Sequence, residues 1–583
     1  MSPSELLLSS PVVIRKSELY ISLSERNAKT CISTFENFIQ QYVKGLFFNT
    51  TVRRILFLCV INLFISSYVF AQTDSSVFKW GNWQTWGDQG NGTYINPILP
   101  GDYSDLDCIR VGKDYYAISS TFQYSPGMVI LHSKDLVNWK ILSHAVDDIT
   151  QISPEMNWDK MNRYGKGIWA GAIRYHNKKF WIYFGTPDEG YFMTSAKNPA
   201  GPWEPLHHIL KEKGWDDCCP FWDDDGQAYF IGTNFGDGYK IHLFKISADG
   251  KELIKESDKI IYQSKGSEAN KLYKINGMYY HFFSEVKKDG RAIMMQRSKS
   301  IYGPYTEVKQ LSHSQKEFHE PNQGGMVQTQ KGDWYFLTHH GSGGDWSGRI
   351  MSLLPVTWID GWPIIGKAGA DTIGTMVWRC TKPVKSLKII APQTNDEFNN
   401  SYLPPQWEWN YNPRKDRWSL TQKKGWLRLY AFKPIEQNNL LKAGNTLTQR
   451  SYRTAFNEVT IKIDISKMAE GQKAGLCHFG SPNYSSFGIE YDSVRFIAYN
   501  IKGVVTKGPV INANMIWLKS TWGLNGESRY FYSLDGITYN AFGDSYQLAW
   551  GAYRGDRIGI YNYNDKGENG LIDVDFFHYK IEK

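Results

Sequence analysis

The chain has 583 residues, a length that exceeds what one hydrophobic core usually supports and predicts two or three domains. Aromatic residues make up 15% of the chain and glycine occurs 52 times, which is typical of proteins rich in strands and turns. The formal net charge of +8 is spread along the sequence without blocks of lysine or arginine. This pattern excludes a nucleic-acid-binding protein that relies on a basic surface.

The N-terminal region contains the pattern of a secretory signal peptide. Two arginines precede an apolar run over residues 55–70, which the small residue Ala71 ends. We therefore predict that residues 1–71 are an extension plus a signal peptide, with a mature start near Gln72 and a secreted or periplasmic location. Because a long segment precedes this pattern, we expect translation to start later than the first methionine, with Val52 as the candidate. The alternative is an uncleaved anchor, since the run is about long enough to span a bilayer; cleavage would leave no stable membrane span.

Five short segments dominated by aromatic residues follow tight turns between residues 110 and 340. These segments are 114–118, 179–183, 227–231, 278–282 and 333–337. They recur about every 50 to 65 residues, and such a recurrence of short strands is the signature of a radial β-array. We therefore predict a five-bladed β-propeller over residues 96–366, preceded by a lead-in over 72–95. The alternative is a β-sandwich with coincidental aromatic hairpins, because aromatic residues favour strands in general.

The C-terminal part lacks the aromatic repeat but still reads as strands. Alternating apolar and polar residues predict strands at 425–430, 456–463 and 572–579. We predict a linker or closing segment over 367–395 and a β-sandwich of the two-sheet, jelly-roll type over 396–583. The expected fold class is therefore all-β, a five-bladed β-propeller followed by a β-sandwich.

The cysteines do not predict a disulfide framework for this fold. Five cysteines follow residue 71, and an odd number excludes complete intramolecular pairing in an exported protein. The neighbours Cys218 and Cys219 could form a vicinal disulfide, although buried free thiols are the interpretation we favour. No cysteine spacing is typical of a zinc site.

Three acidic residues stand where predicted inner strands of the propeller begin, namely Asp105, Asp217 and Glu268. Taken singly, an acid before a strand is more often a turn residue that bonds its own backbone. Equivalent positions in separate blades, however, converge on one central mouth and favour a shared site. We expect Asp216 to be a solvated turn residue. Asp107 is either a second site carboxylate or a turn residue, and we favour the turn residue.

Several segments resemble motifs of glycoside hydrolase family 43. Gly101-Asp-Tyr-Ser-Asp105 resembles the Gly-Phe-Tyr-Pro-Asp motif of that family. Further segments similar to family motifs follow in the same order, at 169–174, 217–226, 268–274, 348–349 and 354–363. From Asp396 onward the chain resembles the concanavalin-A-like C-terminal domain of β-xylosidase-type members. The family is a five-bladed propeller, which agrees with the number of repeats.

The resemblance implies an inverting glycosidase with a division of labour among the three acids. Asp105 would be the general base, Glu268 the general acid, and Asp217 the group that tunes the pKa of the acid and orients it. Inversion places base and acid roughly 6.5–9.5 Å apart so that a water molecule fits between base and sugar. The acid must stay protonated, so burial or a nearby negative charge must raise the pKa of Glu268.

The resemblance also implies residues that hold the sugar. Trp169 and Phe122 would form apolar walls, and Arg349 would hold the terminal sugar and its carboxylate partners; the alternatives are ordinary propeller aromatics and a surface ion pair. Gln323 stands where many relatives carry a histidine at the propeller axis, often near a metal. Because glutamine is a poor metal ligand, we predict no metal site and no required cofactor, and the sequence does not indicate a structural calcium ion.

The function implied is removal of terminal β-D-xylosyl or α-L-arabinofuranosyl groups by an exo-acting hydrolase. Its substrates would be plant cell-wall oligosaccharides or polysaccharides such as xylan, arabinoxylan and arabinan, and no nucleic acid is expected as a partner. The alternative is a lectin-like propeller that binds glycans without hydrolysing them. A lectin would have lost at least one of the three acids, and all three are present.

Overall fold

A computed structural model of the chain describes residues 85–288, 290–314, 322–341 and 344–583. All of these belong to the second of two compact units, Phe78–Lys583, and the predicted signal peptide lies outside the described residues. In this part of the chain, helices are short 3-10 segments, and none is long and apolar enough to cross a membrane. The segments are η3 (Ile149–Gln151), η4 (Pro154–Met156), η5 (Phe235–Asp237), η6 (Lys415–Arg417) and η7 (Leu440–Lys442).

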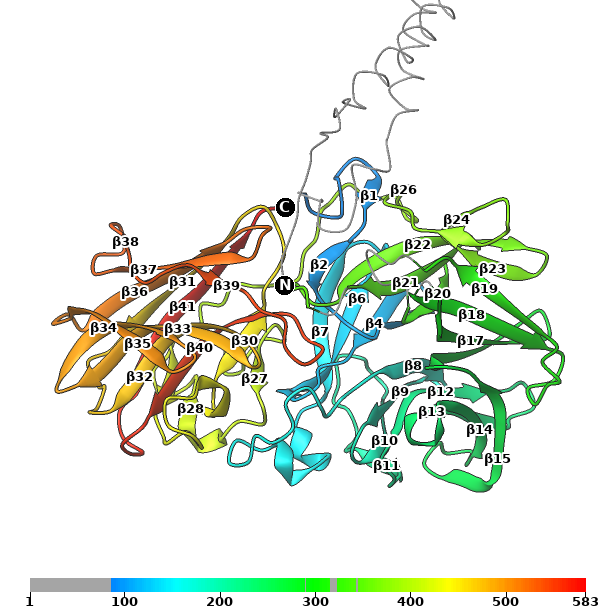
Figure 1. Ribbon diagram of the computed structural model, residues 1–583, viewed down its shortest axis with the longest axis horizontal. Helices are drawn as coiled ribbons and strands as arrows, with labels where there is room; N and C mark the ends of the chain where they lie inside the picture. The colour runs from blue at the N-terminus through cyan, green and yellow to red at the C-terminus, as the bar shows by residue number, and fades with distance from the viewer. Residues whose placement is uncertain (1–84, 289, 315–321, 342–343) are drawn as a thin grey trace, which may run out of the picture. The chain divides into compact units, whose positions relative to one another are not determined.

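Five sheets form the predicted five-bladed propeller (Figure 1). The first four blades use consecutive segments of the chain. Blade one contains β3 (Asp107–Val111), β4 (Asp114–Ser119), β6 (Gly127–Ser133) and β7 (Trp139–Val146), and blade two contains β8 (Gly171–His176), β9 (Lys179–Thr186), β10 (Gly190–Ala196) and β11 (His207–Leu210). Blade three contains β12 (Trp215–Trp222), β13 (Ala228–Asn234), β14 (Lys240–Ile246) and β15 (Leu253–Gln263). Blade four contains β16 (Glu268–Ile275), β17 (Met278–Lys287), β18 (Gly290–Ser298) and β19 (Glu307–Ser312).

The fifth blade closes the propeller with a strand from the N-terminal side. It comprises β20 (Gly324–Gln328), β21 (Trp334–His340), β22 (Ile350–Ile359), the hairpin partner β23 (Trp362–Ile365), and β2 (Leu99–Asp102). Leu99 of β2 pairs with Met351 of β22, so the first strand of the propeller becomes the outer strand of its last blade. The first strand of blade five also contacts the first strand of blade one, which completes the ring.

The aromatic segments found in the sequence are the second strands of the five blades, β4, β9, β13, β17 and β21. A second strand lies between the sheets of two neighbouring blades and is therefore covered on both faces. β9 is buried at every position after Lys179, which explains why its sequence does not alternate between apolar and polar residues.

The C-terminal part is a sandwich of two sheets, as predicted. One sheet contains β27 (Glu408–Asn410), β30 (Leu447–Arg450), β32 (Gln472–Gly480), β33 (Asn483–Asp492), β34 (Val494–Ile501), β35 (Val504–Val510), β40 (Arg557–Asn564) and β5 (Tyr124–Ser125). The other contains β28 (Trp418–Ser419), β29 (Leu427–Tyr430), β31 (Asn457–Asp464), β36 (Met515–Trp522), β37 (Glu527–Ser533), β38 (Asn540–Ala541), β39 (Tyr546–Gln547) and β41 (Leu571–Ile581). The three strands predicted from alternation are β29, β31 and β41, and they are neighbours in this second sheet.

The segment between the two domains pairs with the propeller. β24 (Lys367–Ala368) and β25 (Gly374–Thr375) extend the sheet of blade four, and β26 (Arg379–Thr381) pairs with β1 (Thr93–Ile95). On β12 the adjacent cysteines Cys218 and Cys219 are both buried with free thiols, which is the state favoured from the sequence.

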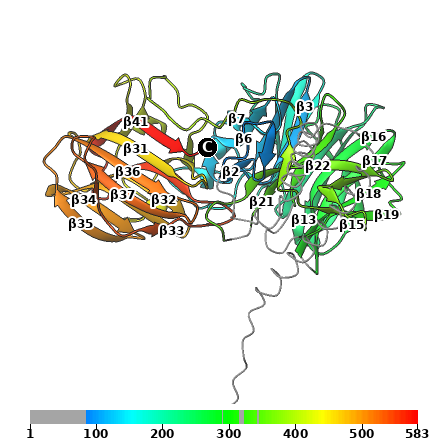
Figure 2. The ribbon, with the colours of Figure 1, turned by 90° about the horizontal axis from the view of Figure 1, so that it is seen from above.

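Propeller and sandwich share a strand pairing and a hydrophobic core. β5 leaves blade one and pairs with β27 at the edge of a sandwich sheet, with Ser125 opposite Trp409. One continuous apolar cluster joins blade-one side chains such as Leu131 and Trp139 to sandwich side chains such as Trp409 and Ile461. β2, β6 and β7 accordingly lie on the side of the propeller next to the sandwich (Figure 2).

A buried carboxylate concentrates charge at this junction. One oxygen of Glu408 lies 3.0 Å from Arg450 and 3.0 Å from the ring nitrogen of His144, and the other lies 2.8 Å from Arg557. The Glu408 side chain has no exposed surface, and although burial opposes its charge, the two arginines hold its pKa well below its ordinary value. A buried pair whose partner is removed leaves an uncompensated charge, which is strongly destabilising.

We predict that Glu408→Ala lowers the free energy of unfolding by roughly 3–5 kcal/mol, because it leaves two buried arginines without their negatively charged partner. Thermal and urea unfolding would measure the loss, with Glu582→Ala, an exposed glutamate near the C-terminus, as the control. Because the folded pKa is depressed, the stabilisation by Glu408 is present above its ordinary pKa of 4.5 and is lost as the pH falls below that value. Equal stability of Glu408→Ala and Glu582→Ala at pH 7 would contradict this role.

Candidate active site

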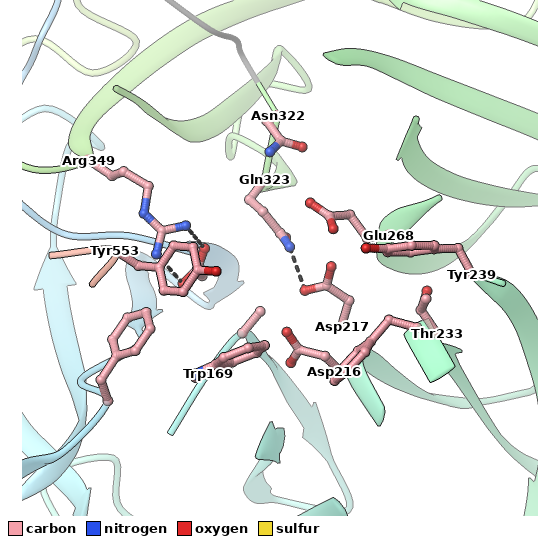
Figure 3. Close-up of a pocket in the computed structure, with 14 residues that line it drawn as sticks. Trp169, Asp216, Asp217, Thr233, Tyr239, Glu268, Asn322, Gln323, Arg349 and Tyr553 are labelled. Carbon is pink, nitrogen blue, oxygen red and sulfur yellow. Dashed lines mark hydrogen bonds and ion pairs between the residues drawn. The ribbon is translucent and has the colours of Figure 1, made fainter. Parts of the chain in front are cut away.

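A pocket of about 340 Å³ lies at the mouth of the propeller, where the inner strands begin (Figure 3). The structure brings all the site residues predicted from the sequence into this one pocket. They are Asp105, Phe122, Trp169, Asp217, Glu268, Gln323 and Arg349. The pocket also receives Tyr553, which comes from a loop of the sandwich.

Unusual backbone conformations aim the acids into the pocket. Asp105, Asp217 and Ala269 have φ values of 55°, 50° and 67°, a left-handed region that costs non-glycine residues about 1–2 kcal/mol each. The pairing of β12 with β13 shifts register after Asp216, and that of β16 with β17 shifts after Glu268. Such bulges break the regular alternation of a strand and redirect a side chain, as expected at a functional site.

Asp105 is held as a carboxylate. Arg349 donates from Nη1 to Oδ1 at 2.7 Å and from Nη2 to Oδ2 at 3.2 Å, and the Ser120 hydroxyl donates to Oδ2 at 2.5 Å. The backbone N–H of Asp105 donates to Nδ1 of His339 at 2.9 Å. Burial opposes ionisation, but Arg349 and the hydrogen bonds outweigh it and lower the pKa of Asp105 below its ordinary value. The side chain is therefore charged at neutral pH and able to accept a proton from water.

Asp217 lies at the centre of a hydrogen-bonded cluster. Its Oδ2 accepts from the backbone N–H of Ala269 at 2.7 Å, and its Oδ1 accepts from Nε2 of Gln323 at 2.5 Å. Asn270 donates to the carbonyl oxygen of Asp217 and to the Thr233 hydroxyl, both at 2.8 Å. Burial raises the pKa of Asp217 above its ordinary value, although the charge of Lys271 and the bonds from Ala269 and Gln323 oppose the rise. Asp217 thus ties blade three to the backbone that follows Glu268.

Glu268 faces the pocket with little to stabilise its charge. Its Oε1 lies 3.2 Å from Nη1 of Arg291, and the side chain is 28% exposed. Burial in the pocket, together with the negative charges of Asp217 and Asp105, raises the pKa of Glu268 to about 7, although Arg291 opposes the rise. A substantial fraction of Glu268 is therefore protonated near neutral pH, as a general acid requires.

Aromatic rings form part of the pocket wall. Phe122 stacks with Tyr553 at a centroid distance of 6.4 Å, and Trp169 meets Tyr553 edge-on at 6.0 Å. The Trp169 ring also lies 6.3 Å from Phe235, with the two rings tilted by 31°. The Trp169 indole N–H donates to the carbonyl oxygen of Gly165 at 3.0 Å, which fixes the ring. Flat apolar walls of this kind suit the faces of a sugar ring.

Arg554 anchors the sandwich loop that carries Tyr553. Its guanidinium has no exposed surface, pairs with Asp102 at 2.7 Å and lies 5.0 Å from the Phe122 ring centroid. It also donates to the carbonyl oxygen of Ser120 at 2.7 Å, beside the hydroxyl that contacts Asp105. The pocket is thus built by propeller and sandwich together.

Two sequence-based expectations were wrong. Asp216 is not a solvated turn residue: it lies on β12 and lines the pocket next to Asp217. Asp107 is neither a turn residue nor a pocket acid: it is buried on β3, where it pairs with Arg174 at 2.6 Å and accepts from the backbone N–H of Ile173. Both lie close to predicted site acids, and the motif spacing did not distinguish their surroundings.

Sequence reasoning missed Tyr553, Tyr239 and Phe235, which also line the pocket. Tyr553 belongs to a domain without the aromatic repeat, so no pattern in the sequence pointed to it. In the part of the chain that the structure describes, no group of three or more histidine, cysteine or acidic side chains is arranged to hold a metal ion.

Comparisons with known proteins agree with this geometry. The family model for glycosyl hydrolases family 43 matches residues 94–363, and that for the β-xylosidase C-terminal concanavalin A-like domain matches residues 395–580. A β-xylosidase of Formosa agariphila is 36% identical over 85% of this chain and 92% of its own length. A non-reducing end α-L-arabinofuranosidase of Bacteroides ovatus is 30% identical over 66% of this chain and 73% of its own length. The crystal structure of a family 43 protein of Bacillus licheniformis superposes with a TM-score of 0.72 at 26% identity, covering 84% of this chain and 100% of that protein.

We predict opposite shifts in the pKa of Glu268 when its two neighbours are changed. Asp217→Asn removes a negative charge and should lower the pKa below about 7, whereas Arg291→Met removes a positive charge and should raise it. Nuclear magnetic resonance of carbon-labelled glutamate would follow the titration, with the exposed Asp224→Asn as a control that leaves it unchanged. Shifts of the same sign in both variants would contradict this electrostatic account.

Proposed function

The chain belongs to glycosyl hydrolases family 43, and on that premise we propose that it is an inverting, exo-acting glycosidase that removes terminal pentosyl groups. The observation that carries the proposal is the pair of acids in one pocket whose pKa values are shifted in opposite directions, Asp105 downward and Glu268 upward. A charged base and a protonated acid at the same pH are what single-displacement hydrolysis needs.

In the proposed reaction, the Asp105 carboxylate takes a proton from a water molecule that attacks the anomeric carbon. Glu268 donates its proton to the glycosidic oxygen as the bond to the leaving group breaks on the other side of the sugar. The negative charge of Asp217 helps to keep the pKa of Glu268 high. Asp217 also accepts a hydrogen bond from the backbone N–H of Ala269, the residue after Glu268, and this bond orients the acid. Carboxyl groups and water suffice for these steps, so no metal or other cofactor is required.

Exo action follows from a pocket that is closed on the sandwich side. Tyr553 stacks on Phe122 and meets Trp169, so a sugar inserted between these rings and the acids would have to be a chain end. The relatives named as a β-xylosidase and an α-L-arabinofuranosidase support xylosyl or arabinofuranosyl groups as the terminal sugar. Xylan, arabinoxylan and arabinan fragments are the proposed substrates.

We predict that Glu268→Gln is impaired according to the leaving group. Hydrolysis of xylobiose, whose leaving group needs a proton, should fall by about 10²–10⁴-fold, whereas a dinitrophenyl xyloside should be affected far less. Asp105→Asn should lose activity on both substrates, because the water then lacks a base. Steady-state rates would measure these losses, and the anomer first formed, followed by proton nuclear magnetic resonance, would test inversion.

Three outcomes would contradict the proposal. Full activity of Glu268→Gln on xylobiose would remove the assignment of the acid. First formation of the retained anomer would exclude the single-displacement reaction. Binding of xylobiose without any hydrolysis by the parent protein would favour the lectin alternative.

We also propose that the mature protein is exported after cleavage near Gln72, on the basis of the apolar run and its flanking residues. Expression of the full chain in a Gram-negative host followed by N-terminal sequencing of the exported protein should give a start near Gln72. Replacement of Leu56 and Leu58 by arginine within the run should block export. An intact N-terminus on membrane-bound protein would instead support the uncleaved anchor.

A further inference from the structure

Asp216 is the pocket acid whose surroundings the proposed reaction leaves unexplained. The other three acids have side-chain partners, since Asp105 binds Arg349, Asp217 binds Gln323, and Glu268 pairs with Arg291. In the described part of the chain, the Asp216 carboxyl group has no ion pair and no hydrogen bond from another side chain; the backbone N–H of Asp217 is its hydrogen-bond partner. Its Oδ1 is fully buried without a hydrogen-bond partner. Because Oδ1 lies against Gly185, the other oxygen of the Asp216 carboxyl group is the one that a ligand in the pocket can reach.

The strand is shaped so that Asp216 faces the pocket together with Asp217. Neighbouring residues of a regular strand point to opposite faces, so two adjacent acids would not normally line one pocket. The register shift that begins at Asp216 and the left-handed backbone of Asp217 break that alternation. Figure 3 shows the Asp216 carboxyl group directed into the pocket between Trp169 and Asp217.

A glycine in the neighbouring blade makes room for this carboxyl group. A Cβ atom on Gly185 would lie 2.7 Å from Oδ1 and 2.8 Å from Cα of Asp216, too close for any side chain. The carbonyl oxygen of Gly185 also accepts a hydrogen bond from the backbone N–H of Trp169, so Gly185 contacts both Asp216 and the backbone that carries the indole. Indole and carboxyl group therefore form one surface of the pocket.

We propose that Asp216 is a sugar-binding residue whose carboxyl group hydrogen-bonds a ring hydroxyl of the terminal sugar that packs against Trp169. The proposal rests on the proposed function, because it assumes that a glycoside occupies the pocket. Burial and the charge of Asp217 raise the pKa of Asp216 well above its ordinary value, against a smaller opposing effect of the Asp217 N–H. This shift favours the protonated form, which can donate as well as accept, as an amide can.

The test compares Asp216→Asn with Asp216→Ala on nitrophenyl β-xyloside and nitrophenyl α-arabinofuranoside. Asparagine keeps a donor and an acceptor, so Asp216→Asn should retain kcat/KM to within about threefold. Asp216→Ala should lose roughly 10–100-fold, the effect of one hydrogen bond to a buried polar group. Asp224→Ala, which alters an acid that is 87% exposed on the next turn, is the matched control and should behave as the parent.

Monodeoxy xylosides identify the hydroxyl and distinguish binding from a structural role. The loss caused by Asp216→Ala should vanish for the one analogue that lacks the contacted hydroxyl and should persist for the others. An equal loss across all deoxy analogues would overturn the proposal, because Asp216 would then act on the fold and not on the sugar. Thermal unfolding of both variants would show whether the fold has changed.

The outcome for Asp216 can be separated from that of the proposed function. If the parent protein hydrolysed neither glycoside, the proposed function would fail, and binding of free D-xylose or L-arabinose would be measured by calorimetry instead. Weaker binding by Asp216→Ala than by Asp216→Asn would still support the sugar contact. Equal binding by the two variants and the parent would overturn it.

Discussion

Asp102 fixes the two arginines on which the geometry of Asp105 depends. One of its oxygens accepts from the backbone N–H of Arg349 at 3.0 Å, and the other lies 2.7 Å from the guanidinium of Arg554. The guanidinium of Arg349 donates hydrogen bonds to the Asp105 carboxylate, and Arg554 donates to the carbonyl oxygen of Ser120. The Ser120 hydroxyl in turn donates to Asp105. These contacts close into a ring that includes a residue of the sandwich. The orientation of the proposed base is therefore a joint property of both domains.

The electrostatic contrast within the pocket follows from this arrangement. Arg349, His339 and the hydrogen bond from Ser120 outweigh burial and lower the pKa of Asp105. At Glu268, burial and the negative charges of Asp217 and Asp105 outweigh the opposing charges of Arg291 and Arg349. In a low-dielectric pocket such differences separate the pKa values of two carboxyl groups that would titrate together in water. Strained backbone at Asp105, Asp217 and Ala269 is the structural cost of placing the groups in this way.

The repeat made most of the fold predictable from the sequence. Each aromatic segment is a second strand covered on both faces, so its composition reports its position in a blade. The acids Asp105, Asp217 and Glu268 were found because they precede or begin inner strands, and this placement brings them to one mouth. Asp216 was not predictable in this way, because a local irregularity decides its position: the bulge after Asp216 turns that residue into the pocket.

Contacts between segments that are far apart in the sequence also could not be predicted from local sequence patterns. Asp107 is adjacent to a motif, but its ion-pair partner Arg174 lies in the next blade. No sequence pattern in either segment predicts this ion pair. Tyr553 reaches the pocket because Arg554 is buried against the propeller, a constraint that exists only in three dimensions. The domain boundaries expected from composition likewise say nothing about β5, which leaves blade one to join the sandwich.

The pairing of β2 with β22 and of β5 with β27 has a consequence for how the chain reaches its native state. Each pairing joins a segment made early in synthesis to one made much later, so the entropy of closing a long loop must be overcome before either contact forms. Blade five and the sandwich edge stay incomplete while the chain emerges, and unpaired edges are templates for aggregation. The topology therefore predicts slow, concerted folding after synthesis in place of blade-by-blade assembly.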